Sequence, residues 1–368
     1  MIRRLKESAL GAKGDVMTRI IKAQGENRMS NNSNLHKAKK AKNDEFFTQL
    51  PDVENELRHY SDHFKGKVVY CNCDDARESN FFKYFSINFE FLGLKKLIAT
   101  GYKKDGRGVL LVYEGDKNGN KTVDDEEVQV TELEGDGDFR SPECVKLLDE
   151  ADVVVTNPPF SLFREYVAQL IEHGKKFLII GNMNAITYKE IFPLIKNNKL
   201  WIGYNFNKTI EFCLGEGYEK WSEIRDGKKY GKVPAIAWYT NLDVKKRHEK
   251  LVLTEKYDPA KYPKFDNYDA INVDKVNNIP KDYAGVMGVP ITFLDKYNPE
   301  QFEIINGFNN SCIEKKAEWN YVPSKDTPTI INGIEKMWNG PVVNKQPKYY
   351  RIIIKRKPSG ENKADCGA

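Results

Sequence analysis

The sequence predicts an α/β protein built on a doubly wound, mainly parallel sheet. Short apolar, β-branched runs alternate with amphipathic stretches between residues 67 and 205, which is the pattern of strand–helix–strand units. Two of these runs are apolar almost throughout, as in strands that are covered on both faces. A polar turn directly follows the run at 67–71, and a proline-rich turn directly follows the run at 152–156. Both turns are expected at the edge where open α/β sheets bind their ligands.

The same patterns predict the elements in order. Asp52 is expected to cap the first helix and Ser141 a later one, because an N-cap oxygen accepts from unpaired backbone N–H groups. Asn118-Gly119 is a hairpin-turn signal within an inserted pair of strands. The expected strands span 67–71, 95–100, 109–113, 127–133, 152–156, 177–180, 200–204, 209–214 and 233–239, and the expected helices span 53–64, 80–92, 142–149, 162–171 and 188–196.

The apolar run that begins at Asp152 ends abruptly in Asn157-Pro158-Pro159-Phe160. The prolines stop the strand, because they lack an N–H donor and fix φ. An amide acceptor, a bare carbonyl and an aromatic face at a strand end fit a planar ring that carries an exocyclic amine. The alternative is a strand followed by a proline-rich turn that binds nothing.

The first strand runs into the polar turn Asn72-Cys73-Asp74-Asp75. A strand, a turn and then a helix form the entry geometry for a nucleotide-like ligand, although the glycine-rich fingerprint GxGxxG is absent. The two carboxylates would accept from ribose hydroxyls or face the cationic end of a ligand that carries an amino acid. The alternative is that Asp75 or Ser79 caps the following helix.

Phe46-Phe47-Thr48 precedes the first expected helix. The segment is interpreted as a lid over a small ligand, with the Thr48 hydroxyl as a hydrogen-bond donor. A hydrophobic staple at the start of the helix explains the two phenylalanines equally well.

No metal site is expected. The segment from Asp116 to Glu127 resembles an EF-hand loop in its ligand types at positions one, three, five, nine and twelve, but Lys121 replaces the glycine of position six and flanking helices are not evident. The six cysteines lack zinc spacing and are expected to be reduced.

Composition narrows the class of protein. The chain of 368 residues is 40% hydrophobic, which is enough for a packed core. No apolar run approaches the roughly 18 residues of a membrane span, and the charged amino terminus lacks the apolar core of a secretory signal. A cytoplasmic protein without membrane contact is expected.

Beyond about residue 241, Tyr, Asn, Lys and Pro dominate the sequence and aromatic residues alternate with Lys and Arg. This composition fits a loop-rich region that contacts nucleic acid through phosphate contacts and stacking, while core packing explains many of the aromatics equally well. The basic clusters Lys245-Lys246-Arg247 and 348–357 suit a polyanion. The alternative for each cluster is a solvated surface.

Together these segments resemble the EcoRI-type adenine-specific DNA methyltransferases. The likeness runs from about residue 35 to the carboxyl terminus. The Asn-Pro-Pro-Phe motif is shared more widely with amino-methyltransferases. The long segment at 285–307 points to this family in particular. The motifs are DEFFTQ at 44–49, VVYCNCDD at 68–75, GDGDFR at 135–140, VVVTNPPF at 153–160 and GVMGVPITFLDKYNPEQFEIING at 285–307.

The resemblance implies a Rossmann-like class I methyltransferase sheet with an inserted hairpin and a loop-rich carboxyl-terminal recognition region. It implies S-adenosylmethionine as methyl donor and N6 of adenine in double-stranded DNA as acceptor. Three regions are expected: a mobile leader at 1–34, a methyltransferase domain at 35–240, and a DNA target-recognition region with a basic tail at 241–368. The residues expected at the donor site are Phe47, Thr48, Asn72, Cys73, Asp74, Asp75 and Asp138.

In this interpretation the Asn157 Oδ1 and the Pro158 carbonyl each accept one N6–H bond, so that the nitrogen lone pair points at the methyl group. Pro159 completes the turn, and Phe160 stacks on the base. Because N6 lies inside the duplex, the adenine must be flipped out, which costs a few kcal/mol.

Two other functions remain open from the sequence. One is an amino-methyltransferase that acts on RNA or on protein glutamine, which the Asn-Pro-Pro-Phe motif alone allows. The other is a non-catalytic DNA-binding protein that retains the fold. This alternative is considered because the turn at Asn72 to Asp75 lacks glycine. A monomer is expected, and the sequence leaves open whether a cognate restriction endonuclease acts on the same site.

Overall fold

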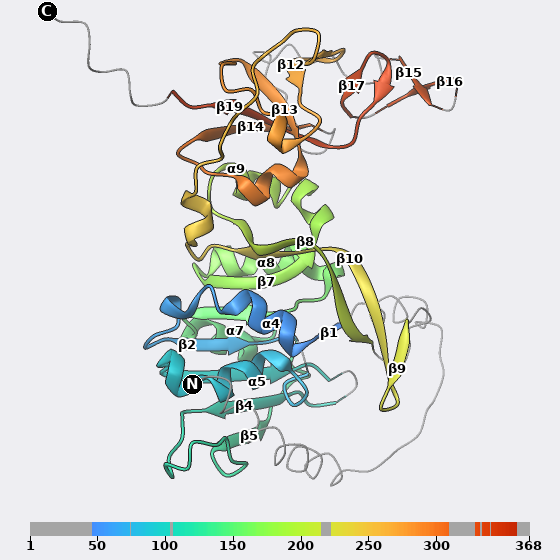
Figure 1. Ribbon diagram of the computed structural model, residues 1–368. Coiled ribbons are helices and arrows are strands. Elements are labelled where there is room, and N and C mark those ends of the chain that lie inside the picture. The colour runs from blue at the N-terminus through green and yellow to red at the C-terminus, as the bar shows by residue number, and fades with distance from the viewer. Residues whose placement is uncertain are drawn as a thin grey trace, which may run out of the picture. The chain divides into compact units, whose positions relative to one another are not determined.

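A computed structural model describes residues 46–73, 75–103, 106–214, 222–308, 328–331, 333–338 and 340–358, and Figure 1 shows their elements. The expected leader at 1–34 lies outside these residues. The chain divides into two compact units. The first unit holds the described residues up to Ser161 together with those between 210 and 232, and the second holds 162–209 and the described residues from Val233 onward.

Three parallel strands form the centre of the first unit. β2 (Val68–Cys71) lies between β3 (Lys96–Gly101) and β6 (Val153–Thr156) and pairs in parallel with both. Every residue of β2 and β6 is buried, which explains why both runs are apolar rather than alternating. Because β3 and β6 flank β2 on opposite sides, the strand order reverses at β2.

Helices connect these strands in the doubly wound order of a Rossmann-like fold. α5 (Asn80–Ile87) and α6 (Phe89–Leu92) join β2 to β3, and α7 (Pro142–Glu150) leads into β6. Parallel crossovers are right-handed, so connections that run to opposite sides of β2 place their helices on opposite faces of the sheet. The predicted cap of α7 is confirmed, because the Ser141 side chain accepts from the N–H of Cys144 at 3.2 Å.

The inserted hairpin is also confirmed. β4 (Val109–Tyr113) pairs antiparallel with β3 and with β5 (Val128–Glu132). After β5 the chain returns to the carboxyl end of β3, where Lys103 N donates to the carbonyl of Asp136 at 2.8 Å.

Glycine makes this return possible. A Cβ on Gly137 would lie 2.5 Å from the carbonyl oxygen of Gly101, and Gly137 has a φ of 84°. Only glycine combines a left-handed φ with so close a backbone approach. The segment from 135 to 138 is therefore held against the end of β3.

Shorter strands and a helix complete the first unit. β1 (Phe46–Thr48) pairs antiparallel with the last residues of β8 (Trp201–Leu214), and α4 (Leu50–Leu57) follows it. β9 (Glu223–Arg225) pairs antiparallel with the first residues of β10 (Lys228–Thr240).

In the second unit, β7 (Lys176–Asn182) pairs antiparallel with the last residues of β10, and α8 (Phe163–Glu172) contacts β7. Gly181 permits close packing on this strand, because a Cβ there would lie 2.6 Å from the ring of Phe163.

A second sheet forms from the carboxyl-terminal region. Its strand order is β11 (Lys264–Phe265), β12 (Tyr268–Asn272), β13 (Val286–Pro290), β19 (Arg351–Arg356) and β14 (Phe302–Phe308). Only β12 and β13 are parallel. A core cluster of this region comprises Phe265, Tyr268, Ala270, Phe308, Val343 and Ile353.

Two small hairpins lie outside both sheets. β15 (Pro328–Ile331) pairs with β16 (Ile334–Met337), and β17 (Val342–Val343) pairs with β18 (Gln346–Pro347). The remaining short elements are η1 (Ser61–His63), η2 (Phe160–Leu162), η3 (Met183–Thr187), α9 (Phe192–Lys196), η4 (Lys245–His248), η5 (Val276–Asn278) and η6 (Ile291–Lys296). No helix in the described ranges is long and apolar enough to cross a membrane.

The first helix differs from the prediction of 53–64 with Asp52 as its cap. α4 begins at Leu50, its N-cap position is Gln49, and Asp52 lies within its first turn. Pro51 explains the earlier start, because proline is favoured in the first helical turn, where its missing N–H costs no hydrogen bond. The helix also ends earlier, at Leu57, and the separate turn η1 follows.

The strands predicted at 200–204 and 209–214 are one strand, β8. Asn207 takes a φ of 52° within it. An extra residue with left-handed φ is typical of a β-bulge, which bends a strand without ending it. The helix predicted at 188–196 is shorter, since only α9 is α-helical there.

We predict that Gly137→Ala lowers thermal stability more than Gly119→Ala. Both glycines have left-handed φ values, 84° and 77°, so alanine costs about 1–2 kcal/mol at either position. Only at Gly137 would the new Cβ meet backbone, whereas nothing lies within 4 Å of it at Gly119. Melting curves followed by circular dichroism measure the difference, and equal losses would contradict the close approach to Gly101.

Candidate active site

The carboxyl ends of β2 and β6 lie side by side at one edge of the first unit. The register pairs Tyr70 with Val154, so two residues further on Thr156 is level with Asn72. The Thr156 Oγ1 donates a hydrogen bond to the carbonyl oxygen of Asn72, and both residues are buried. The polar turn and the Asn-Pro-Pro-Phe motif therefore begin at the same point, where the strand order reverses and open α/β sheets bind ligands.

The Asn-Pro-Pro-Phe motif stands just past the end of β6. Asn157 is 6% exposed, Pro158 is buried, and Pro159 and Phe160 are half-buried. Phe160 opens the turn η2, and the α-helix begins only at Phe163. The asparagine is thus held in the protein interior, while the second proline and the aromatic residue after it retain accessible surface.

The turn after β2 has the backbone conformation that glycine usually supplies. Cys73 has a φ of 65°, in the left-handed region that costs most residues about 1–2 kcal/mol. The sequence departs from a glycine-containing turn at this point, but the backbone retains a left-handed residue. Asn72 is buried and Cys73 half-buried.

The sequence left open whether Asp75 or Ser79 caps the helix that follows this turn, and the structure assigns the cap to Ser79. Ser79 caps α5, because its Oγ accepts from the N–H of Phe81 at 3.2 Å. Asp75 is exposed and accepts from the N–H of Arg77 at 2.9 Å, which closes a local turn. Asp74 lies outside the described residues.

Thr48 has a buried hydroxyl that is not satisfied within the described part of the chain. The residue is 1% exposed, and its Oγ1 has no hydrogen-bond partner there. Its carbonyl accepts from Asn80 Nδ2 at 2.7 Å, so β1 is tied to the first residue of α5. A buried hydroxyl without a partner costs about 1–3 kcal/mol, and a bound ligand would remove this cost. Phe47 lies in the same strand, opposite Cys213.

Asp138 lies in the loop that glycine holds against the end of β3. Its Oδ2 accepts from Arg140 Nη2 at 2.6 Å. This hydrogen bond is the main cause of a lowered pKa for the Asp138 carboxyl. The group therefore remains an ionised acceptor, and a carboxylate has further lone pairs for a ligand.

The loop between β4 and β5 uses its polar side chains internally. Asp116 accepts from the N–H groups of Gly119 and Lys121, both at 2.6 Å. Glu127 is buried and accepts from the N–H of Lys117 at 2.8 Å. Within the described ranges, no group of three or more His, Cys, Asp or Glu side chains is arranged to hold a metal ion.

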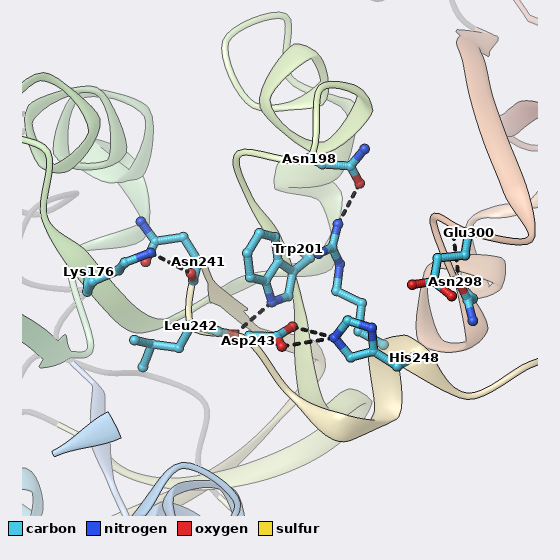
Figure 2. Close-up of polar contacts among 10 residues, drawn as sticks. Lys176, Asn198, Trp201, Asn241, Leu242, Asp243, His248, Asn298 and Glu300 are labelled. Carbon is cyan, nitrogen blue, oxygen red and sulfur yellow. Dashed lines mark hydrogen bonds and ion pairs between the residues drawn. The ribbon is translucent and has the colours of Figure 1, made fainter. Parts of the chain in front are cut away.

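The basic cluster Lys245-Lys246-Arg247 forms η4 in the second unit, and Figure 2 shows polar contacts around it. Lys246 forms an ion pair with Asp295 and donates to the carbonyl of Tyr204 at 3.0 Å. Lys245 is exposed. The positive charge of Lys246 is therefore largely neutralised by the Asp295 carboxylate. The exposed Lys245 side chain can contact a polyanion.

Arg247 packs within the second unit. Its guanidinium carbon lies 4.0 Å from the centroid of the Trp201 ring, and its Nη2 donates to Asn198 Oδ1 at 2.5 Å. Burial is the main cause of a lowered pKa for this group. The sequence did not reveal this role, because it depends on residues some 50 positions away. A small pocket here is lined by Ile195, Trp201, Ile202, Val244, Lys246, Arg247, Leu294, Asp295 and Tyr297.

The chain matches known proteins along most of its length. A family model described as the adenine-specific methyltransferase EcoRI matches residues 34–357. The type II methyltransferase M.EcoRI of Escherichia coli is 50% identical over 345 residues, which cover 90% of this chain and 98% of that protein. M.MgeORF184P of Mycoplasma genitalium is 40% identical and M.MpnI of Mycoplasma pneumoniae 39% identical, and each match covers 88% of this chain and 98% of the relative.

We predict that Arg247→Ala lowers the melting temperature by several degrees and that Lys245→Ala leaves it unchanged. The first substitution removes a half-buried cation–π contact and a hydrogen bond, together worth about 1–3 kcal/mol. The second alters an exposed side chain, where changes are usually within about 0.5 kcal/mol. Differential scanning calorimetry distinguishes the two, and an unchanged melting temperature for Arg247→Ala would show that its contacts do not stabilise the fold.

Proposed function

The chain belongs to the EcoRI family of adenine-specific DNA methyltransferases, and on that premise we propose how its residues transfer a methyl group from S-adenosylmethionine to N6 of a flipped adenine in duplex DNA. The single observation that carries the proposal is the hydrogen bond from Thr156 to the Asn72 carbonyl. It joins the turn proposed for the donor to the motif proposed for the acceptor.

The residues present fit the donor. When bound, S-adenosylmethionine supplies a methyl group on a sulfonium centre, together with ribose hydroxyls and an adenine ring. The buried Thr48 hydroxyl offers a hydrogen bond that the described chain leaves unused. The turn from Asn72 to Asp75 and the ionised Asp138 carboxylate offer acceptors for hydroxyl and amino groups.

Asn157 and Pro158 would orient the acceptor. The lone pair of adenine N6 is delocalised into the ring, which makes the nitrogen a weak nucleophile. Two acceptors, the Asn157 Oδ1 and the Pro158 carbonyl, would each take one N6–H bond. This would pyramidalise the nitrogen, withdraw its lone pair from conjugation and direct it at the methyl group. Phe160 would stack on the base, and Pro159 fixes the turn between them.

Most of the rate would come from positioning and from fixed dipoles. Holding two reactants in line contributes up to about 7–11 kcal/mol in favourable cases. The carbonyl dipoles of Asn157 and Pro158 would stabilise positive charge as it develops on N6, and dipoles held fixed by the fold need little reorganisation. No general base is required before transfer, because the extra N6 proton leaves afterwards.

We infer the partners from the same function. The region at 241–368 would bind the duplex, with Lys245 at a phosphate, and flipping would bring the adenine to Asn157. A monomer in the cytoplasm, where the DNA lies, is sufficient for this reaction. A restriction endonuclease that cuts the same unmethylated site would be the natural companion of a type II methyltransferase.

A transfer assay tests the proposal. Donor labelled in its methyl group is incubated with mixed-sequence duplex DNA, RNA and protein, and the nucleosides are separated after digestion. We expect label in N6-methyladenine from DNA. Label confined to RNA or protein glutamine would refute it, and the absence of donor binding in calorimetry would favour a non-catalytic DNA-binding protein.

We predict that Asn157→Ala reduces turnover by about 10²–10³-fold, the scale of losing one polar group that stabilises a transition state. Donor affinity, measured by calorimetry, should stay within a few-fold of the parent value. Asn184→Ala, at an exposed asparagine after another strand, is the matched control and should retain full turnover. Normal turnover in Asn157→Ala would remove this residue from the mechanism.

We also predict that Thr156→Val lowers turnover by about 10–100-fold while the protein remains folded. Valine has the shape of threonine but leaves the buried Asn72 carbonyl without this donor, so the donor turn and Asn157 lose their common anchor. Misplacement by about 1 Å costs up to about 10²-fold in rate. Thr156→Ser should restore turnover, because it restores the hydroxyl. Parental turnover in Thr156→Val would show that the bond does not position the reactants.

A further inference from the structure

We infer that the hairpin of β15 and β16 binds duplex DNA through the face that carries Ile331, Ile334 and Lys336; this rests on the proposed function. The hairpin is a two-stranded sheet separate from the five-stranded one, and Figure 1 draws it as a ribbon apart from β13, β14 and β19. A two-stranded ribbon of this kind fits the major groove of DNA.

The register assigns the side chains to two faces. Ile331 is opposite Ile334, and Thr329 is opposite Lys336. Directly opposed residues share a face and neighbours alternate, so these four lie on one face. Ile330, opposite Glu335, lies on the other face. The first face therefore carries a cation and the second an anion.

The proposed face presents apolar surface at the tip. Ile334 is 59% exposed and Ile331 half-buried, while Thr329 at the base is buried. Gly333, with a φ of 77°, turns the chain between the two isoleucines. In DNA recognition, apolar side chains of this kind contact thymine methyl groups or base steps.

The hairpin is anchored through β15, the strand that carries Ile330. Ile330 N donates to the Lys345 carbonyl at 2.9 Å. The turn at Asn344 and Lys345 is bound by the Asp266 carboxylate, at 3.0 and 2.7 Å to their N–H groups. Asn267 is buried and accepts from Val342 N at 3.2 Å. The ribbon is thus attached to the second unit through β15, while Ile334 and Lys336 are exposed on β16.

The face carries one cation, Lys336, and the surrounding chain is basic, which favours DNA as its partner. Residues 328–357 contain seven Lys or Arg and one acid, Glu335, a net charge of +6, whereas the whole chain has a net charge of +5. Asp274 pairs with Lys348 and Arg351 at 3.3 Å. Lys336, Lys345, Lys355 and Lys357 are exposed. A second copy of this chain would bring the same positive charge against the face, whereas a phosphate backbone complements it.

Three substitutions test the inference on a duplex that the parent protein methylates. Ile334→Ala is expected to weaken binding at least fivefold without changing the dependence on salt. Lys336→Gln is expected to reduce the slope of log K against log salt by about 0.9, the value for one phosphate contact. Ile330→Ala, on the other face of the same ribbon, is the matched control and should bind within twofold of the parent.

Fluorescence anisotropy at several salt concentrations gives these values, and melting curves verify that each variant is folded. Parental affinity in Ile334→Ala, or an equal loss in Ile330→Ala, would overturn the assignment of the face. A dimer seen by light scattering without DNA and lost in Ile334→Ala would assign the face to a second copy instead. If the parent protein neither binds nor methylates any duplex, the proposed function fails; if it does both, only the hairpin is at issue.

Discussion

The hydrogen bond from the Thr156 hydroxyl to the carbonyl of Asn72 links two segments that are 84 positions apart in the sequence. It depends on the parallel pairing of β2 with β6, which brings two strand ends to the same level. Each end then contributes different chemistry, a polar turn on one side and the Asn157 amide followed by two prolines on the other. In the proposed function a methyl transfer needs both groups within one approach distance, and the pairing of the strands brings the two segments together.

Periodicity and turn chemistry predicted most of the fold. The apolar runs located β2 and β6, and the Asn-Gly signal located the hairpin of β4 and β5. The boundaries that were wrong have local causes. α4 begins earlier in the chain than predicted because Pro51 is favoured in a first helical turn. β8 continues through a polar stretch because Asn207 adopts a left-handed conformation. Each of these effects depends on a single residue, whereas the prediction relied on sequence patterns that extend over many residues.

The position of the candidate site residues was predictable where they are contiguous in sequence, and their roles stay a prediction. Asn157 to Phe160 lie together at a strand end, as four adjacent residues of one motif must. The role of Thr156 was not predictable, since a hydroxyl at the end of a β-branched run has no visible partner until the register is known. The same holds for the stacking of Arg247 on Trp201, while its expected role in DNA binding stays a prediction. Long-range partners decide such roles, and the sequence does not contain them explicitly.

The position of the donor tests the central claim most directly. A crystal structure with S-adenosylhomocysteine bound should show the sulfur at the edge formed by β2 and β6, facing the side chain of Asn157. The ligand should also contact the turn at Asn72 and the hydroxyl of Thr48. A ligand bound elsewhere on the protein, or one whose sulfur faces away from Asn157, would contradict the account.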